Sequence, residues 1–452
     1  MLREEMKQLR PGDRLPSSRE LMRVHNVSPV TVSRALGLLA AEGRVITKPG
    51  SGAYVAPPIA RAGDTADLSW QTVALGDRTV DDTGVSGLLT PPPDGVIPLT
   101  GGYLNPALRP TRALSAAASR ALRHPEVWEL PPLTGVSGLR RWFVQEIGGD
   151  ATPSDALIVS GGQAALTHAF RALAAPGTPV LVETPTYPGA LAAARAAGLR
   201  ATAVPMDHDG VIPELLAEAF AVTGARVFFC QPTLHNPTGA TLTLERRRQV
   251  LDIARAAGAF VIEDDYARYF TTVPTPPPMI ALDAHGTVVH INSSPRSCRP
   301  ACASRGSSPG VPRRRLRAVQ IVESFFVARP LQETALEFVG SSSWRRHLAT
   351  LGAELTVRRD TLAAALTARM PTCEIHLVPH GGLHLWVRLP PDRDEDAVVE
   401  AAWRAGALVS PGRIYHPAEP PGPWIRVTHS AAVHVAELAE GVRRLATALD
   451  AP

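Results

Sequence analysis

The chain of 452 residues is poor in several residue types that mark particular classes of protein. Its four cysteines suit a reducing compartment, where disulfides are rare. The only close pair, Cys298 and Cys302, lacks a second Cys or His pair at zinc-site spacing, so we expect no metal site. No apolar run approaches the roughly 20 residues of a membrane span, and the charged start MLREEMKQLR lacks the apolar centre of a secretory signal. We therefore expect a cytoplasmic protein without a membrane anchor.

Lysine is almost absent, since it occurs only at Lys7 and Lys48. No residue after position 48 can therefore supply a primary amine side chain. Charge is also uneven along the chain. Residues 1–60 contain 9 Lys and Arg against 5 Asp and Glu, whereas the remaining residues contain 37 of each kind. A basic region joined to a neutral body is typical of a head that binds an anionic partner.

The first 56 residues predict two helices followed by a hairpin. LPSSRELMRVHNV begins with a Pro-Ser-Ser cap and continues as a short amphipathic helix. In SPVTVSRALGLLAAEG, Ser28 is a suitable N-cap, Gly43 ends the helix, and the apolar residues between them recur at helical spacing. RVITKPGSGAYV contains two short β-like runs around Pro-Gly-Ser-Gly. This order predicts a winged helix-turn-helix, whose second helix enters the major groove of DNA.

PGDRLPSSREL, VSPVTVSRAL and PGSGAYV together resemble the DNA-binding domain of the GntR family. A helix before them would begin at or near Met1 and would be short for this domain. The alternative is a small structural helical module. The resemblance assigns six residues to DNA binding, namely Arg19, Thr31 and Arg34 as contacts, with Lys48, Gly50 and Gly52 in the wing.

Residues 57–96 have little periodicity and many Pro, Gly and Asp residues, so we expect a linker with some local structure. From about residue 97, apolar runs such as ALIVS, PVLVE and AFVIED alternate with helical stretches. This alternation predicts an α/β fold, with a mostly parallel sheet covered by helices on both faces. Ligands of such sheets bind beyond the carboxyl ends of the strands.

Residues that could bind a ligand or take part in chemistry follow these strands or lie late in the chain. Each has an ordinary alternative: a tight turn, a buried structural tyrosine, an Asn-Pro turn, a helix-capping aspartate, or a salt bridge. Glycines before a helix can hold phosphate on free backbone N–H groups, and a buried carboxylate needs a partner such as a protonated ring nitrogen. The candidates are Gly161, Gly162 and Gln163 after ALIVS, Tyr187 in TPTYPGA, Asn236 in TLHNPTGA, Asp264 and Tyr266 in DDYARYF, and Arg426 in WIRVTHS.

Taken in order, these motifs resemble fold-type I aminotransferases over about residues 97–450. Together with the GntR-like head, the chain resembles a MocR-type regulator. The resemblance implies a fold-type I transferase domain over 97–452, with a large part at about 97–330 and a small C-terminal α/β subdomain at about 331–452. It also implies a homodimer, pyridoxal 5′-phosphate as cofactor, and an amino acid or amine as effector.

The same resemblance assigns a role to each candidate. Gly161, Gly162 and Gln163 would hold the phosphate, Tyr187 would stack on the cofactor ring, Asn236 and Tyr266 would bond its 3-oxygen, Asp264 would pair with its pyridine nitrogen, and Arg426 would bind the carboxylate of an amino-acid effector.

The family's Schiff-base lysine, expected near Pro295 and Arg296, is absent, so we assign no catalytic residue. If the reading frame is moved back by one base, GC-rich codons for Ser294–Pro312 can encode Phe-Ser-Lys-Val-Leu-Pro-Pro-Gly-Leu-Arg-Leu-Ala-Gly-Phe-Val-Ala-Gly-Gly-Pro, which resembles the family motif. One hypothesis is therefore a local frameshift, either a sequencing error or a real lesion, that is restored near Arg313. The other is a diverged loop.

This aberrant segment has a structural and a functional consequence. We expect local disorder over 293–314, because Arg, Ser and Pro replace a core strand and cannot fill a central position. We expect a DNA-binding regulator that lacks the Schiff-base lysine. The alternatives are an aminotransferase whose lysine motif was lost by the frameshift, and a remnant that binds DNA at most.

Overall fold

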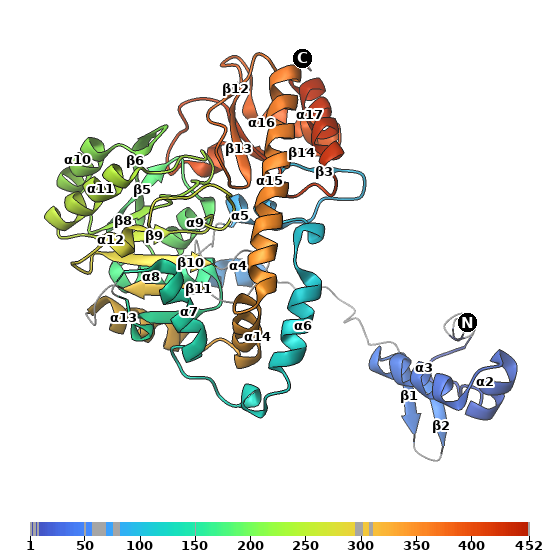
Figure 1. Ribbon diagram of the computed structural model, residues 1–452. Helices are drawn as coiled ribbons and strands as arrows, with labels where there is room; N and C mark the ends of the chain where they lie inside the picture. Colours follow the sequence, from blue (N-terminus) through green and yellow to red (C-terminus); the bar gives the residue numbers. More distant parts are fainter. Residues whose placement is uncertain are drawn as a thin grey trace. The chain divides into compact units, whose positions relative to one another are not determined.

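The computed structural model describes Leu2, Met6 and residues 9–48, 51–56, 69–75, 82–149, 151–293, 302–306 and 311–450. The chain separates into a first unit, Met1–Thr79, and a second unit, Val80–Pro452 (Figure 1). Among the described residues, no helix combines the length and the apolar character that crossing a membrane requires.

The first unit is the winged helix-turn-helix that the sequence predicts. Ser17 and Ser28 cap the two helices of the motif, because their hydroxyls accept hydrogen bonds from the backbone N–H groups of Glu20 and Thr31, both at 3.2 Å. A small core that includes Leu15, Leu39 and Val45 holds the helices against the hairpin. Gly50 lies outside the described residues. The elements are α2 (Ser18–His25), α3 (Pro29–Ala41), β1 (Val45–Lys48), antiparallel β2 (Gly52–Val55) and the short α4 (Ser69–Leu75).

The second unit is built on an eight-stranded sheet, which is mostly parallel as predicted. Strands β10, β9, β8, β5 and β6 pair in parallel, whereas β11 is antiparallel to both of its neighbours and β7 is antiparallel to β6. In sheet order the strands are β4 (Ala156–Val159), β11 (Cys302–Gly306), β10 (Val288–Ser293), β9 (Phe260–Asp264), β8 (Val227–Cys230), β5 (Pro179–Thr184), β6 (Arg200–Asp207) and β7 (Gly210–Val211).

Helices cover both faces of this sheet (Figure 1). Successive strand residues point to opposite faces, so Val180 and Val182 pack in one apolar cluster and Leu181 packs in the other. One face carries α8 (Gly162–Leu173), α9 (Pro188–Ala196) and α13 (Val311–Ser324), and the other carries α10 (Pro213–Thr223), α11 (Leu244–Ala256) and α12 (Met279–Leu282). A third cluster joins α6 (Thr111–Ala121), α7 (Ser137–Ile147) and α14 (Arg329–Val339).

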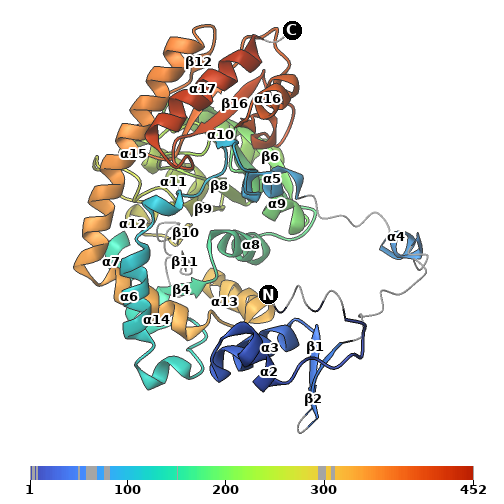
Figure 2. The same cartoon turned by 90° about the vertical axis from the view of Figure 1, so that its right-hand side faces the viewer.

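The C-terminal part is a smaller α/β layer, reached through the long helix α15 (Ser342–Arg369), which runs beside both parts of the second unit (Figure 1, Figure 2). Its strands are β12 (Glu374–Ile375), β13 (His384–Arg388), β16 (Trp424–Thr428) and β15 (Ser410–Pro411), covered by α16 (Glu395–Arg404) and α17 (Val435–Leu449). A separate pair joins β14 (Ala407–Leu408) to β3 (Ile97–Pro98). Short 3-10 helices occupy Pro106–Leu108, Pro125–Trp128, Pro153–Asp155 and Arg413–Tyr415.

Part of the predicted linker folds with the second unit. Helix α5 (Thr83–Leu89) packs against α9. Gly84 lies where an added side-chain carbon would come within ordinary contact distance of Ile414 and Pro188. No apolar period is visible in the sequence here, because this helix is only two turns long. Residues 57–68 and 76–81 of the predicted linker lie outside the described residues.

The aberrant segment contributes a strand, so the expectation that it cannot fill a central position is wrong. Strand β11 lies between β4 and β10, with Cys302 opposite Val159 on one side and Ser293 on the other. Its five residues, CASRG, contain no proline, so each backbone can pair on both sides. Residues 294–301 and 307–310, including Pro295 and Arg296, lie outside the described residues, so the predicted disorder there stays a prediction.

Candidate functional site

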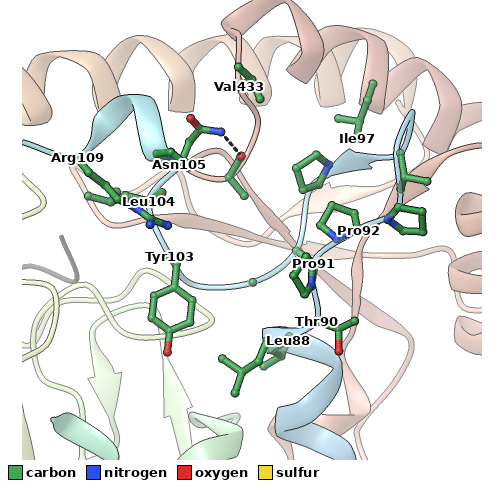
Figure 3. Close-up of a pocket in the computed structure, with 18 of the residues that line it drawn as sticks. Leu88, Thr90, Pro91, Pro92, Ile97, Tyr103, Leu104, Asn105, Arg109 and Val433 are labelled. Atoms are coloured by element: carbon green, nitrogen blue, oxygen red, sulfur yellow. Dashed lines mark hydrogen bonds between the residues drawn. The ribbon is translucent and has the colours of Figure 1, made fainter. Parts of the chain in front are cut away.

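A cavity of about 1710 Å³ lies beyond the carboxyl ends of β4 and β9. Six residues that the sequence picks out line it together: Gly161, Gly162, Gln163, Tyr187, Asp264 and Tyr266. Figure 3 shows other residues that line the cavity, among them Leu88, Pro91, Pro92, Ile97, Tyr103 and Arg109. Because this cavity lies at strand ends of an α/β sheet, it is placed where such folds bind ligands.

The glycine end of the cavity has the geometry of an anion cradle. Gly161 has a φ of 141°, which only glycine adopts readily, and α8 begins at the next residue. The first backbone N–H groups of α8 have no partner within the helix, and its dipole places positive potential there. The side chain of Gln163 is already engaged, since its Nε2 donates to the Gly189 carbonyl at 2.7 Å. This bond uses one of the two hydrogens of the amide, and the backbone N–H groups of the first turn of α8 are further donors.

Tyr187 lies at the N-terminus of α9, and its side chain is held in place. Its hydroxyl donates to Gln163 Oε1 at 3.3 Å. A side-chain carbon added at Gly189 would come within 2.3 Å of Cζ of the tyrosine ring. The ring therefore lies directly across the first turn of α9, and glycine at 189 is what allows it to do so.

Asp264 places a buried carboxylate at the cavity wall. It ends β9, the residue is only 5% exposed, and its Oδ2 accepts a hydrogen bond from Gln231 Nε2 at 2.8 Å. The Gln231 backbone N–H donates in turn to Glu183 Oε2 at 2.8 Å. Gln231 was not among the predicted residues, although its position directly after the buried strand VFFC is the same signal that marked the others.

The neighbouring residue Glu263 serves a structural purpose on the other face of β9. Its carboxylate accepts hydrogen bonds from the Met279 N–H at 2.7 Å and the Ile280 N–H at 3.1 Å, and it contacts His290 Nδ1 at 2.9 Å. Burial raises the pKa of a carboxyl, but here His290 and Arg247 bring the pKa of Glu263 below its usual value. This buried network fixes the end of β9 and hence the position of Asp264.

Asn236 and Arg426 meet behind the cavity and do not line it. Arg426 Nη1 donates to Asn236 Oδ1 at 3.0 Å, and its Nη2 donates to the Gly101 carbonyl. The guanidinium also lies 5.2 Å from the centre of the Tyr415 ring, and Arg426 is 1% exposed. Since Oδ1 of Asn236 faces the arginine, its Nδ2 is the end available to donate. These two bonds use two of the five N–H groups of the guanidinium.

Tyr266 lines the cavity but directs its hydroxyl into the protein. The hydroxyl donates to the Leu234 carbonyl at 3.0 Å. A phenol has a single hydrogen to donate, so a bond donated to a ligand oxygen would replace the bond to Leu234.

These residues fit the ring and phosphate of pyridoxal 5′-phosphate but not its covalent attachment. The glycine cradle suits a phosphate, Tyr187 an aromatic ring, and the buried carboxylate of Asp264 a protonated ring nitrogen. The only lysines of the chain, Lys7 and Lys48, both belong to the first unit.

The first unit leaves its predicted DNA-binding residues open to solvent. Arg19, Thr31, Arg34, Lys48 and Gly52 are all exposed. Thr31 also helps to start α3, because its Oγ1 lies 2.9 Å from the Oγ of Ser28. The wing contains a feature that sequence reasoning missed: Lys48 Nζ lies 5.2 Å from the centre of the Tyr54 ring.

Comparison with known proteins gives two family matches. The family described as aminotransferase class I and II matches residues 100–445, and that described as bacterial regulatory proteins, gntR family, matches residues 1–55. The HTH-type transcriptional regulator TauR of Rhodobacter capsulatus is 28% identical over 97% of this chain and 93% of its own length. The uncharacterized HTH-type transcriptional regulator YdcR of Escherichia coli is 27% identical over 90% of this chain and 88% of its own.

Solved aminotransferases share the fold of the second unit. LysN of Thermus thermophilus, an α-aminoadipate aminotransferase complexed with N-(5′-phosphopyridoxyl)-L-leucine, superposes with a TM-score of 0.77 at 24% identity, covering 84% of this chain and 98% of LysN. Kynurenine aminotransferase of Pyrococcus horikoshii superposes with a TM-score of 0.75 at 24% identity, covering 85% of this chain and 98% of its own. The chain therefore belongs to the aminotransferase class I and II family and carries a gntR-family domain at its N-terminus, an arrangement consistent with a MocR-type regulator.

Proposed function

We propose that this protein is a DNA-binding transcription regulator whose second unit binds pyridoxal 5′-phosphate without a covalent bond and responds to an amino acid or amine. The observation that carries the proposal is the joining of two features in one chain. An exposed winged helix-turn-helix precedes a cavity lined by residues suited to the cofactor, in a unit that has no lysine. Relatives that match almost the whole chain are named as regulators, which supports the same reading.

In the first unit, α3 would enter the major groove of DNA. Arg34 and Thr31, exposed on this helix, have the donors and acceptors to read base edges, and Arg19 on α2 can reach the backbone. Lys48 in the wing would contact a phosphate as a point charge. The proposal includes a homodimer in the cytoplasm, as the family resemblance implies.

In the second unit, each cavity residue has a separate task. The N-terminus of α8 would bind the phosphate, and the ring of Tyr187 would cover one face of the cofactor. Asp264 would hold a proton at the pyridine nitrogen, because an ionised carboxylate favours the charged form of its partner. Asn236 lies behind the cavity wall, and its Nδ2 is the end that would reach the 3-oxygen, since Arg426 holds its other end. When bound, the cofactor supplies an aldehyde that is reactive toward amines.

Transamination, the alternative function, is poorly supported by this chain. It needs a primary amine to anchor the cofactor and to move the proton at the α-carbon of the substrate. No residue after position 48 offers one, and arginine cannot substitute because its guanidinium stays protonated.

A band-shift titration with the DNA upstream of the gene tests the proposed function. We expect binding that weakens steeply with salt, because counterions are released from the phosphates. Replacing Arg34 by Ala should lower the affinity by about 10-fold or more, the size of a lost base contact. The matched control is Arg255→Ala, which removes an exposed arginine from α11 in the second unit. Equal affinity of the wild type for this DNA and for unrelated DNA at physiological salt would contradict the proposal.

A further inference from the structure

The charged side chains that line the cavity are not equally available to a ligand. Glu437 accepts hydrogen bonds from the backbone N–H groups of Val433 and His434. Arg444 is bound to Glu440 and donates to the Gly95 and Gly406 carbonyls. Asp264 is held by Gln231. These charges are therefore already engaged inside the protein.

Arg109 is different, because only one of its nitrogens is fixed. Its Nε donates to the Leu104 carbonyl at 2.9 Å, and the residue is exposed on the cavity wall. Among the described residues, no carboxylate lies within ion-pair distance of its guanidinium. A guanidinium held at Nε keeps Nη1 and Nη2 as a forked pair of donors, which is the geometry that carboxylates bind.

The loop that carries Arg109 is anchored at several points. Asn105 Nδ2 donates to the Ala431 carbonyl at 3.0 Å, its Oδ1 accepts from the Ala107 N–H at 2.9 Å, and its backbone N–H donates to the Ser430 carbonyl at 2.9 Å. Figure 3 shows Arg109, Leu104 and Tyr103 along one wall of the cavity, with the Asn105 bond drawn. The forked donors therefore project from a fixed backbone, which lowers the entropy lost when a ligand binds.

Arg426 is the residue that the sequence suggests for a ligand carboxylate, but unlike Arg109 it is buried. It is 1% exposed, it does not line the cavity, and its Nη1 and Nη2 donate to Asn236 and Gly101. The geometry points to Arg109 as a residue that binds a carboxylate of an amino-acid ligand in this cavity. This inference rests on the proposed function, in which the cavity takes the cofactor and an amino acid.

The carboxylate that Arg109 binds is either the α-carboxylate or the side-chain carboxylate of an acidic amino acid. Stable cofactor conjugates distinguish these two cases. The probes are N-(5′-phosphopyridoxyl)-L-leucine, its analogue made from isopentylamine, which lacks the carboxylate, and the corresponding L-glutamate and L-glutamine conjugates. The full chain is titrated with each by calorimetry. In the wild type we expect the carboxylate that Arg109 binds to tighten binding by about 10-fold or more.

In Arg109→Gln, the ratio of affinities with and without that carboxylate should fall close to one. The affinity for the conjugate that lacks the carboxylate should stay unchanged. A loss of the leucine-over-isopentylamine gain identifies the α-carboxylate, and a loss of the glutamate-over-glutamine gain identifies the side-chain carboxylate. The control Arg112→Gln removes an exposed arginine three residues away that does not line the cavity, and should change neither gain.

Two results would overturn the inference alone: both gains persisting in Arg109→Gln, or an equal weakening of all four conjugates, which would place Arg109 at the phosphate instead. If no conjugate binds the wild type, the proposed cofactor site itself fails, and this inference fails with it.

Discussion

At the scale of single residues, Asp264 carries most of the case for a cofactor. A carboxylate that is 5% exposed at a cavity wall is stable only with a hydrogen-bonding or charged partner. Gln231 supplies one hydrogen bond to its Oδ2, and a protonated ring nitrogen would supply a charge as well. The ion pair would therefore be worth more than an ordinary hydrogen bond to the bound cofactor.

Replacing Asp264 by Asn should weaken the binding of pyridoxal 5′-phosphate by about 10-fold to 100-fold, the range of a lost charge-assisted bond. The amide keeps the size of the side chain, so the fold should persist. Absorbance titration or equilibrium dialysis measures the change, and Asp252→Asn on the exposed side of α11 is the control. Unchanged cofactor affinity in Asp264→Asn would show that the ring nitrogen is held elsewhere.

Residue by residue, the sequence predicts the site where its signals are local. Gly161 and Tyr187 each follow a recognisable strand, Asp264 ends one, and the structure brings all three to one cavity. Sequence reasoning did not reach the pairing of Arg426 with Asn236, because these residues are 190 positions apart and meet only through the packing of the C-terminal layer. Arg109 was missed for a related reason: nothing in its local sequence distinguishes a cavity-facing arginine from a solvated one.

At the scale of elements, α9 shows how one glycine positions a functional side chain. The ring of Tyr187 occupies the space that a side chain at Gly189 would need. Helix α5 packs against the same helix, so the predicted linker contributes to the cavity region. The strand β11 was likewise not expected, because its sequence is polar. It forms because strands pair through their backbones, which does not require apolar side chains.

Gly189→Ala should destabilise the second unit by about 1–3 kcal/mol through overpacking, and should weaken cofactor binding by displacing Tyr187. Thermal unfolding followed by circular dichroism measures the first effect, and dialysis measures the second. Gly87→Ala on α5 adds the same carbon where nothing lies within 4 Å, so it should be neutral or slightly stabilising. If the two variants have the same thermal stability and cofactor affinity, the position of the Tyr187 ring does not depend on Gly189.

In the wing, Lys48→Ala should weaken DNA binding about equally for specific and unrelated sequences. Its ammonium would contact a phosphate and not a base, so the slope of log affinity against log salt should fall by about 1. Band shifts at several salt concentrations measure both quantities. A loss confined to the specific sequence, with an unchanged slope, would instead assign Lys48 to base recognition.

At the scale of the whole molecule, residues 1–60 carry all of the excess positive charge, whereas the remaining residues are neutral overall and contain no lysine. Most of the fold of both units, apart from α5 and β11, follows from the sequence, because helix caps, alternating strands and glycine turns agree with one another along the chain. The segment 293–314 is where the sequence departs from the family motif that the rest of the domain resembles. A DNA read of these codons decides between a frameshift and a diverged loop.

Borohydride reduction of the full chain with pyridoxal 5′-phosphate, followed by peptide mapping, tests the central claim most directly. We expect the cofactor to bind, to be removed by dialysis before reduction, and to leave no reduced adduct on any peptide from residues 80–452, because that unit has no primary amine side chain. An adduct mapped to that unit would contradict the account of a regulator that holds its cofactor without a covalent bond.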